Sequence, residues 1–356
     1  MSIFSPYSTC EVLMLAKLFK PVSTFLVVLT VCLAPALSAD TLNRRFAIGS
    51  GGAVTVICSG GSVSLEGSMR EDIQVTAVCD KEINKYYDLD FQTLGDSLVI
   101  IAEAKNVASN FLNLFKIRGN RPGLKFTLSV PNATNSHLNT SGGRITASAL
   151  TGCVEARTSG GGLNIDQVTG DVNGYTSGGS IDCNNVTGQV TLKTSGGGIR
   201  LYEVNGPFDA RTSGGTIMAG GLNGEGSLST SGGGIRVKSG NGRLTVKTSG
   251  GSITVNGMQG SLNAYTSGGS IEAELTSQPS GDCELKTSGG GIRFSLPRAS
   301  NARIDANTSG GSVSTDLPVT VEGEVGRNSL EGRLGQGGPL LTLKTSGGNI
   351  RISAGD

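Results

Sequence analysis

The chain has 356 residues, among them 56 glycines and no tryptophan. Its 29 basic side chains nearly balance its 28 acidic ones, so bulk charge excludes the strongly basic composition that is typical of nucleic-acid-binding proteins. The glycines fall in register with Ile, Leu and Val, which excludes a disordered low-complexity chain and indicates tight turns between short strands.

The first 39 residues have the layout of a secretory signal. Lysines precede an apolar run over 25–34, and small residues lead up to Ala39. The run is shorter than the ~20 residues that a membrane-spanning helix needs, so we expect no transmembrane span in the mature chain. The sequence therefore predicts an exported protein, in the periplasm or at the cell surface. Met14 would give a signal of more ordinary length than Met1.

Residues 40–139 alternate apolar and polar side chains over short stretches, as half-buried strands do. We interpret them as an irregular N-terminal β cap, with first rungs that cover one end of a stacked structure. Residues 105–121 interrupt this pattern with apolar side chains at helix-like spacing, followed by basic ones. A short helix or loop folded over the edge is expected there; a membrane- or partner-docking excursion is the alternative.

Two cysteines of this segment lie at a spacing that suggests a disulfide. Cys58 occupies the place of a repeated threonine described below, and Cys79 follows 21 residues later, the length of the longer repeats. If Cys79 opened the next repeat, the two would stack on neighbouring parallel strands ~4.8 Å apart, within disulfide reach. Two separate buried thiols are the alternative. Of the five cysteines after residue 39, at least one has no partner within the chain.

A four-residue phrase, Thr-Ser-Gly-Gly, recurs eleven times from Thr140 to Thr345. The first eight copies are 18 residues apart, the next two intervals are 21, and the last is 37. A fixed period of this size is typical of a solenoid in which each repeat is one coil. We therefore predict an all-β fold, a single-chain β-solenoid (β-helix) of 18-residue, two-strand rungs over 140–356. An insertion over 317–344 should shield the last rung.

The interior of a rung follows from counting its threonine as position 1. Positions 6, 8, 11, 15 and 17 are mostly apolar, and Gly occupies position 13, so two short strands should be joined by two glycine corners. Along the strand, the threonine follows positions 15 and 17 in the alternation, so its side chain should also point inward. Successive rungs would then form a ladder of stacked threonine hydroxyl groups. The rung from Thr212 has glycine at position 15, Gly226, and we expect the solenoid to open there first.

Position 18, the last residue of an 18-residue rung, and Lys286, the last residue of the longer rung that follows, should face outward and form a basic and aromatic stripe with ~4.8 Å spacing. Such a stripe could follow an anionic polymer, such as a polysaccharide or lipid head groups. A solvated face, partly compensated by acidic side chains two positions earlier, is the alternative. The stripe consists of Arg157, Tyr175, Lys193, Arg211, Lys247, Tyr265 and Lys286, and the acidic neighbours are Glu155, Asp209 and Glu284.

The sequence offers no catalytic constellation. His137 is its only histidine, and no Cys-x-x-Cys pair is present. Glycine-rich phosphate loops need a following helix, whereas strands are expected after these glycines. We accordingly predict no cofactor, no metal site and no enzymatic activity, and we rank an enzyme acting on polysaccharide last among the functional hypotheses.

With its rungs laid out, the chain resembles a bacterial envelope family known as putative adhesins with β-strand repeats, a domain of unknown function. The resemblance rests on the Thr-Ser-Gly-Gly-x-Ile phrase, the strand ending at Val130-Pro131 and the closing stretch from Gly337 to Ile352. It implies an envelope protein with an adhesin-like or scaffold role. The expected partner is an anionic envelope polymer, a glycan or another envelope protein. A structural protein that stacks end to end is the alternative.

Overall fold

The computed structural model describes residues 39–105, 122–321 and 326–355, which lie within one compact unit, Ser38–Asp356. These residues form β-strands and one short helix, α1 (Ile83–Tyr86). The signal layout predicted over 1–39, Met14 included, and nearly all of the 105–121 stretch lie outside the described residues. In the part that is described, no helix is long and apolar enough to cross a membrane.

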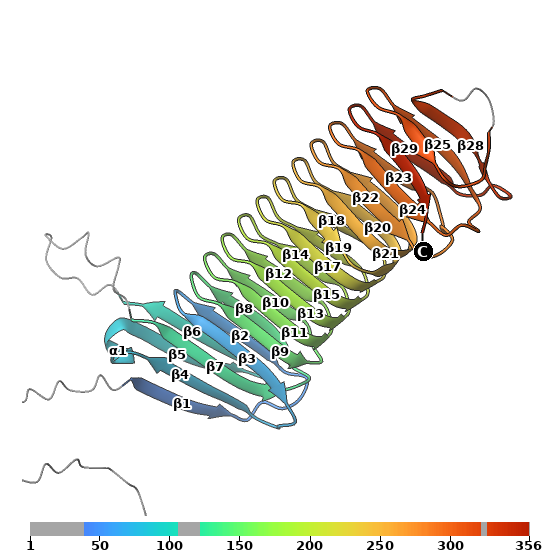
Figure 1. Ribbon diagram of the computed structural model, residues 1–356. Helices are drawn as coiled ribbons and strands as arrows, with labels where there is room; N and C mark the ends of the chain where they lie inside the picture. The colour runs from blue at the N-terminus through green and yellow to red at the C-terminus, as the bar shows by residue number, and fades with distance from the viewer. Residues whose placement is uncertain (1–38, 106–121, 322–325, 356) are drawn as a thin grey trace, which may run out of the picture. The chain divides into compact units, whose positions relative to one another are not determined.

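The regular rungs stack as parallel strands along two faces of the unit (Figure 1). The first face contains β8 (Asn135–Thr140), β10 (Val154–Thr158), β12 (Val172–Thr176), β14 (Val190–Lys193), β16 (Phe208–Arg211), β18 (Gly226–Ser229), β20 (Gly240–Lys247) and β23 (Cys283–Thr287). The second face contains β9 (Ile145–Leu150), β11 (Leu163–Thr169), β13 (Ile181–Thr187), β15 (Ile199–Asn205), β17 (Ile217–Asn223), β19 (Ile235–Val237), β22 (Ile271–Leu275) and β24 (Ile292–Leu296). The long strand β21 (Ile253–Tyr265) contributes to both faces.

Neighbouring rungs pair in register, and their apolar side chains form the core. Thr158 pairs with Thr176 on the first face, and Ile181 pairs with Ile199 on the second. In the rung from Thr176, positions 6, 8, 11, 15 and 17 are all completely buried, as expected for inward-facing side chains: they are Ile181, Cys183, Val186, Val190 and Leu192. The predicted all-β solenoid of two-strand rungs is confirmed.

The threonine of the repeated phrase connects each rung to the preceding one. In the middle of the stack, Thr194 Oγ1 donates a hydrogen bond of 2.8 Å to the carbonyl oxygen of Gly179 in the rung before. Thr194 Oγ1 also accepts a hydrogen bond of 3.4 Å from the backbone N–H of Gly197, which is position 4 of the rung that Thr194 begins. Equivalent bonds recur from Thr158 to Thr345, so the predicted ladder of inward hydroxyl groups is present.

The two glycines of the phrase differ in how much space a Cβ atom would have. A Cβ on Gly161, at position 4, would lie 1.9 Å from the carbonyl oxygen of Gly143 in the preceding rung, a contact that the backbone cannot relieve cheaply. A Cβ on Gly160, at position 3, would lie 3.6 Å from its nearest neighbour, an ordinary contact. Close stacking of the corners thus requires glycine at position 4 but not at position 3.

Several rungs also bend at position 10, where glycine is not required. Ala149, Gln167, Asn185 and Glu203 have φ between 52° and 57° there, and glycine occupies the same position in two later rungs, as Gly221 (φ 65°) and Gly257 (φ 63°). This left-handed conformation costs about 1–2 kcal/mol for a residue with a Cβ. The expectation of two glycine corners was therefore incomplete, because a third bend lies within the second-face strand, ahead of the position-13 glycine such as Gly188 (φ 147°).

The rung from Thr212 is better packed than its composition suggests. A Cβ on Gly226 would lie 2.4 Å from Cδ2 of Phe208, because the Phe208 ring from the preceding rung occupies that space. Phe208 is buried, and its backbone pairs with Gly226. A large side chain in one rung thus compensates for a missing one in the next. The expectation that this rung opens first remains a prediction.

The N-terminal end of the stack departs from sequence order. The earliest rung, β2 (Ala53–Cys58) and β3 (Ser62–Ser68), lies between the regular rungs and a later pair, β6 (Ser97–Ala104) and β7 (Leu124–Pro131). Antiparallel strands then cover the outer edges: β5 (Tyr87–Leu94) on β6, and β4 (Ile73–Cys79) on β7, with β1 (Asp40–Phe46) on β4.

The C-terminal end uses the same arrangement in reverse (Figure 1). The last rung, β29 (Leu340–Thr345) and β30 (Ile350–Ala354), is inserted between β23/β24 and the rung formed by β25 (Ala302–Thr308) and β26 (Val313–Thr315). The antiparallel strand β28 (Ser329–Leu334) covers β25 and pairs with β27 (Val319–Val321). Strand β28, which lies within residues 317–344, thus covers the outer edge of β25 on the first face, whereas the pairings of the described residues place no strand on the outer edge of β26.

The strand order also corrects the stacking on which the Cys58–Cys79 disulfide was predicted. Cys58 on β2 pairs with Ala102 and Thr140, whereas Cys79 on β4 pairs with Asp40 and Leu124. Strand β4 does not open the next parallel rung; it runs antiparallel to β7 at the end of the stack. Both thiols are buried and free, as the alternative held.

Candidate functional site

Position 18 of the first-face strands presents a continuous row of side chains. The register places each next to its neighbour in the adjacent rung, in the order Arg157, Tyr175, Lys193, Arg211, Ser229, Lys247, Tyr265, Lys286 and Lys344. Strands in such a sheet lie ~4.8 Å apart, which sets the spacing of the row. Lys344 joins it because β29 lies beside β23.

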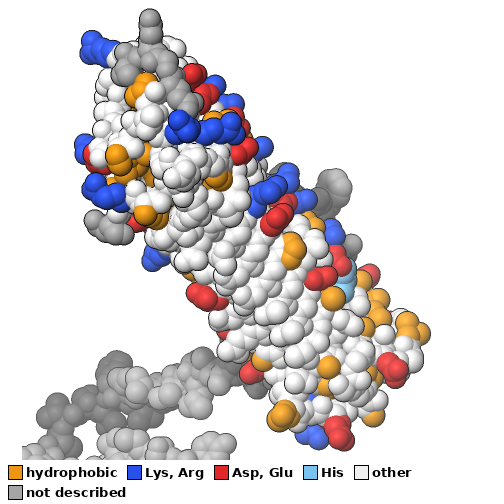
Figure 2. Space-filling model, turned by 90° about the vertical axis from the view of Figure 1, so that its right-hand side faces the viewer, with side chains coloured by type: hydrophobic (Ala, Val, Ile, Leu, Met, Phe, Trp, Pro, Cys, Tyr) orange, Lys and Arg blue, Asp and Glu red, His pale blue; other side chains and the backbone are white. Residues whose placement is uncertain are grey.

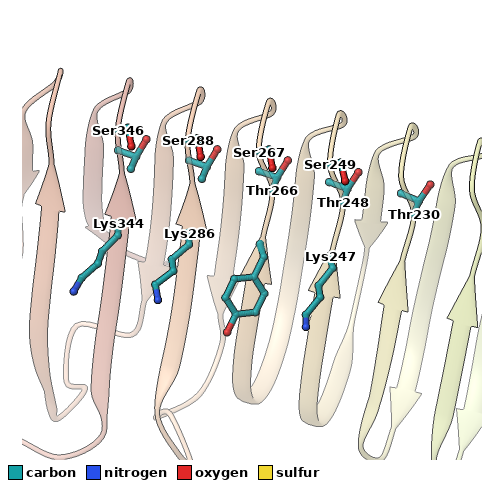
Figure 3. Close-up of a pocket in the computed structure, with 13 residues that line it drawn as sticks. Thr230, Lys247, Thr248, Ser249, Thr266, Ser267, Lys286, Ser288, Lys344 and Ser346 are labelled. Atoms are coloured by element: carbon teal, nitrogen blue, oxygen red, sulfur yellow. The ribbon is translucent and has the colours of Figure 1, made fainter.

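A shallow groove follows this row. It is lined by the side chains that precede each repeated threonine, by the ladder threonines, and by the exposed serines at position 2; Figure 3 shows the threonines and serines at the corner and the lysines along the strands. We call this feature the basic groove. Its larger hollow, about 590 Å³, includes Lys247, Tyr265, Lys286, Lys344 and the serines Ser249, Ser267, Ser288 and Ser346. A second hollow of about 280 Å³ lies along Arg157, Tyr175 and Lys193.

Acidic side chains compensate several of the cations, and on the face drawn in Figure 2 basic and acidic side chains lie next to one another. Arg157 Nε lies 2.7 Å from Glu155 Oε1, and Arg211 Nε lies 2.9 Å from Asp209 Oδ2. Lys344 Nζ lies 3.0 Å from Asp305 Oδ2. Lys286 forms an ion pair with Glu284, and hydrogen bonding from Lys286 is the main cause that lowers the pKa of Glu284. The compensation anticipated at Glu155, Asp209 and Glu284 is therefore present.

Two lysines differ from the other cations of the row. Lys193 and Lys247 have threonine, not an acidic residue, two positions earlier, and within the described ranges no carboxylate lies within 4 Å of either Nζ. Instead, Lys193 Nζ lies 5.8 Å from the centroid of Tyr175 and Lys247 Nζ lies 5.3 Å from that of Tyr265. Cation–π contacts leave the ammonium charge uncancelled, so these two positions attract anions most directly.

The ring faces of the two tyrosines in the row contact neighbouring cations. The Arg157 guanidinium carbon lies 4.6 Å from the centroid of Tyr175, which also contacts Lys193. Tyr265 Oη donates a 2.5 Å hydrogen bond to Glu284 Oε2. Desolvation, reinforced by this bond, raises the pKa of Tyr265 to about 12, so the phenol stays neutral at physiological pH. Stacking of a sugar ring on Tyr175 would compete with two cations, and on Tyr265 with one, Lys247.

The remaining chemistry-bearing residues do not converge on a reaction centre. His137 Nδ1 lies 2.9 Å from Glu155 Oε2, and among the described residues no hydrogen bond joins this histidine to a serine, threonine or cysteine. Over the same residues, no group of three or more His, Cys, Asp or Glu side chains is placed to hold a metal ion.

The sequence interpretation missed two parts of the groove. Lys344 directly precedes Thr345, as the other members of the row precede their threonines, but its place beside Lys286 depends on the inserted rung. The serines of position 2 were interpreted only as part of a turn. They are exposed, and Figure 3 shows them at the corner beside the ladder threonines.

The fold and the groove define a class: a β-solenoid whose repeated corners border one long, open groove. The chain belongs to the Toastrack DUF4097 family, whose sequence model matches residues 55–353. This confirms the resemblance to the adhesin-like family of unknown function. No curated protein matches the sequence significantly.

Several solved structures resemble this one at low identity. A protein described as a putative adhesin from Parabacteroides merdae is 12% identical, with TM-score 0.35, over 89% of this chain and 96% of that one. A putative lipid binding protein from Parabacteroides distasonis is 12% identical, with TM-score 0.30, over 89% and 97%. A putative adhesin from Bacteroides fragilis is 11% identical, with TM-score 0.27, over 89% and 98%. Likeness at this level carries no conclusion about a ligand.

Proposed function

We propose that the protein is an exported, non-enzymatic module of the cell envelope that binds an extended anionic glycan along the basic groove. The observation that carries this proposal is the larger open hollow, which Lys247, Lys286 and Lys344 line together with a row of serines at the neighbouring corner (Figure 3). Lysine ammonium groups attract carboxylate or phosphate groups of a polymer, and hydroxyl groups can bond its sugar oxygens.

The geometry suits a long ligand better than a compact one. The groove repeats the same groups rung after rung, so a polymer can make many weak contacts, whose sum gives useful affinity. It is open, and none of its lining lysines is buried, so a small anion would remain largely hydrated there. Association of this kind weakens as salt rises, because exposed charges are screened beyond ~8–10 Å at physiological ionic strength.

End-to-end stacking, the alternative suggested by the sequence, has less support. On the first face, the stack ends in antiparallel strands: β5 covers β6 at one end and β28 covers β25 at the other. A further copy could not continue the parallel pairing there, and covered edges are a usual means of preventing edge-to-edge association.

The test uses residues 40–356 and polygalacturonate as a probe, with affinity measured by calorimetry at low and physiological salt. The triple variant Lys247→Gln, Lys286→Gln and Lys344→Gln should bind about 100-fold more weakly, if each lysine contributes ~1 kcal/mol as basic side chains do at an anionic membrane surface. A matched control variant removes three positive charges at positions outside the groove. It combines Arg200→Gln, Arg236→Gln and Lys238→Gln.

The control variant should bind like the parent chain. Equal weakening in both variants would mean that only net charge matters and would contradict a groove-specific site. Binding that is insensitive to the triple variant would refute the proposal. Melting curves of all three proteins show whether each is folded.

A further inference from the structure

A second concentration of positive charge lies on the other side of the Thr-Ser-Gly-Gly corner, on the second face. Arg293 of β24 pairs in register with Arg351 of β30, so the two backbones are ~4.8 Å apart and both side chains are exposed on the same side. The residues are 58 positions apart in sequence and meet only because β30 is inserted beside β24. Like charges on directly paired strands destabilise a sheet unless something compensates them.

The two arginines border a hollow of about 460 Å³ that contains no acidic residue. Its other lining groups are Ser270, Gly291, Ile292, Ser312, Ser314 and Asn349. Asn349 Oδ1 accepts the backbone N–H of Ser312 at 2.9 Å and its Oγ–H at 3.3 Å. Ser270 Oγ accepts the N–H of Gly291 at 3.3 Å. Since these acceptors are engaged, the Asn349 amide N–H groups and the Ser270 hydroxyl proton remain available as donors.

The nearby carboxylates leave this hollow positively charged. Glu272 pairs in register with Arg293, but within the described part of the chain no ion pair under 4 Å joins them. Glu272 and Glu274 instead line a second hollow, which Arg293 and Arg351 also border, and neither glutamate lines the hollow that contains Asn349. Asp316 Oδ2 lies 3.8 Å from Arg351 Nη2, a long and exposed contact. By contrast, Arg200, in the same row, lies 2.8 Å from Asp182 and is compensated.

We propose that the hollow between Arg293 and Arg351 binds a phosphate group, either free or as a phosphate monoester of a sugar. Paired guanidinium groups offer planar forks of N–H donors that match a tetrahedral oxyanion, and the anion would relieve their mutual repulsion. Asn349 and Ser270 supply neutral donors to the remaining oxygens. The site is separate from the basic groove, so the two proposals can fail independently.

The test is calorimetric titration of residues 40–356 with inorganic phosphate and, separately, with glucose 6-phosphate. The double variant Arg293→Gln and Arg351→Gln should bind the preferred ligand at least tenfold more weakly. The control is Arg236→Gln, which removes an arginine from the same row where the paired neighbours are Met218 and Thr254. It should leave binding unchanged.

The two ligands distinguish the source of the phosphate. Equal affinity supports a site for the free oxyanion, and tighter binding of glucose 6-phosphate supports a site for a phosphorylated sugar. Absence of saturable binding to both ligands would overturn the proposal. Undiminished binding by a double variant that melts like the parent chain would also overturn it.

Discussion

The middle of the stack and its two ends are built by different rules. In the middle, each strand pairs with the strand one repeat away, as Ile181 does with Ile199. At the C-terminal end Thr287 pairs with Thr345, and at the N-terminal end Cys58 pairs with Thr140. Local repetition is enough to extend a solenoid, whereas closing it requires contacts between residues far apart in sequence.

Both ends use rung insertion followed by antiparallel covering. The first rung of the sequence is covered by a later one, and the last rung is covered by an earlier one. A parallel strand at the end of a stack would leave its N–H and C=O groups open to another chain, and this arrangement hides the first-face edges at both ends. The middle and the ends should therefore respond differently to the same kind of damage.

Removal of the inserted C-terminal rung should have the largest effect. Deletion of residues 340–356 removes four completely buried side chains, Leu341, Leu343, Ile350 and Ile352. At about 1.5–3 kcal/mol each, the loss is about 6–12 kcal/mol, comparable to the whole stability of a domain. It also separates β23/β24 from β25/β26. We expect loss of the cooperative thermal transition, measured by circular dichroism, together with aggregation on size exclusion.

The control for this deletion removes only residues 355–356, which retains the whole of β30. It should melt within a few degrees of the parent chain. If the longer deletion melted equally close to the parent, the inserted rung would not be needed to close the stack.

Substitution at a corner in the middle should have a smaller but definite effect. Gly161→Ala places a Cβ 1.9 Å from the Gly143 carbonyl oxygen, so the two rungs must separate, at about 1–3 kcal/mol. Gly160→Ala, one residue earlier, meets nothing closer than 3.6 Å and should change stability by less than about 0.5 kcal/mol. Urea denaturation of both variants tests this; equal midpoints would show that rung spacing is not fixed by position 4.

Thiol labelling of the unaltered chain should compare local opening in the middle of the stack with local opening at its ends. Burial raises the pKa of the Cys183 thiol, in the middle of the stack, to about 12, while Cys153 is exposed. Burial also raises the pKa of Cys58 and of Cys283, nearer the two ends. With iodoacetamide at pH 8, Cys153 should react first, Cys58 and Cys283 more slowly, and Cys183 last. Faster labelling of Cys183 than of Cys283 would show that the middle opens before the end.

The smallest expected effect concerns pH. Hydrogen bonding from Arg157, with a further contribution from His137, holds the pKa of Glu155 below its ordinary value. The stabilisation is therefore fully present above that ordinary value, about 4.3, and is lost as pH falls through the lowered folded-state pKa. Because the pair is about one-third to one-half exposed, it should contribute well under 1 kcal/mol.

Melting temperatures of the parent chain and of Arg157→Gln should accordingly differ slightly at pH 7 and converge once the pH lies below the lowered pKa of Glu155. Lys193→Gln, at a position without a carboxylate partner, serves as the control and should show no such pH dependence. A gap between parent and Arg157→Gln that persisted after Glu155 is protonated would mean that Arg157 stabilises the row through Tyr175 and not through Glu155.

Much of the regular architecture was predictable because its cause repeats with the sequence. Apolar side chains at positions 6 and 8 predicted the buried faces, and the inward parity of threonine predicted the hydroxyl ladder that joins Thr194 to Gly179. The outward row from Arg157 to Lys286 followed from the same count. In each case a residue's surroundings are set by its equivalent one repeat away.

What the sequence alone could not decide are the contacts made outside that repeat. The bend at position 10 is formed by residues as different as Ala149 and Glu203 and, in other rungs, by glycine, so residue type does not predict it reliably. The mistaken stacking of Cys58 on Cys79 assumed sequential order where β4 turns antiparallel. Lys344 beside Lys286 and Arg351 beside Arg293 exist only because the last rung is inserted before the preceding one. Periodicity determines how a rung is built, whereas edge closure, a property of the assembled stack, determines which rungs become neighbours.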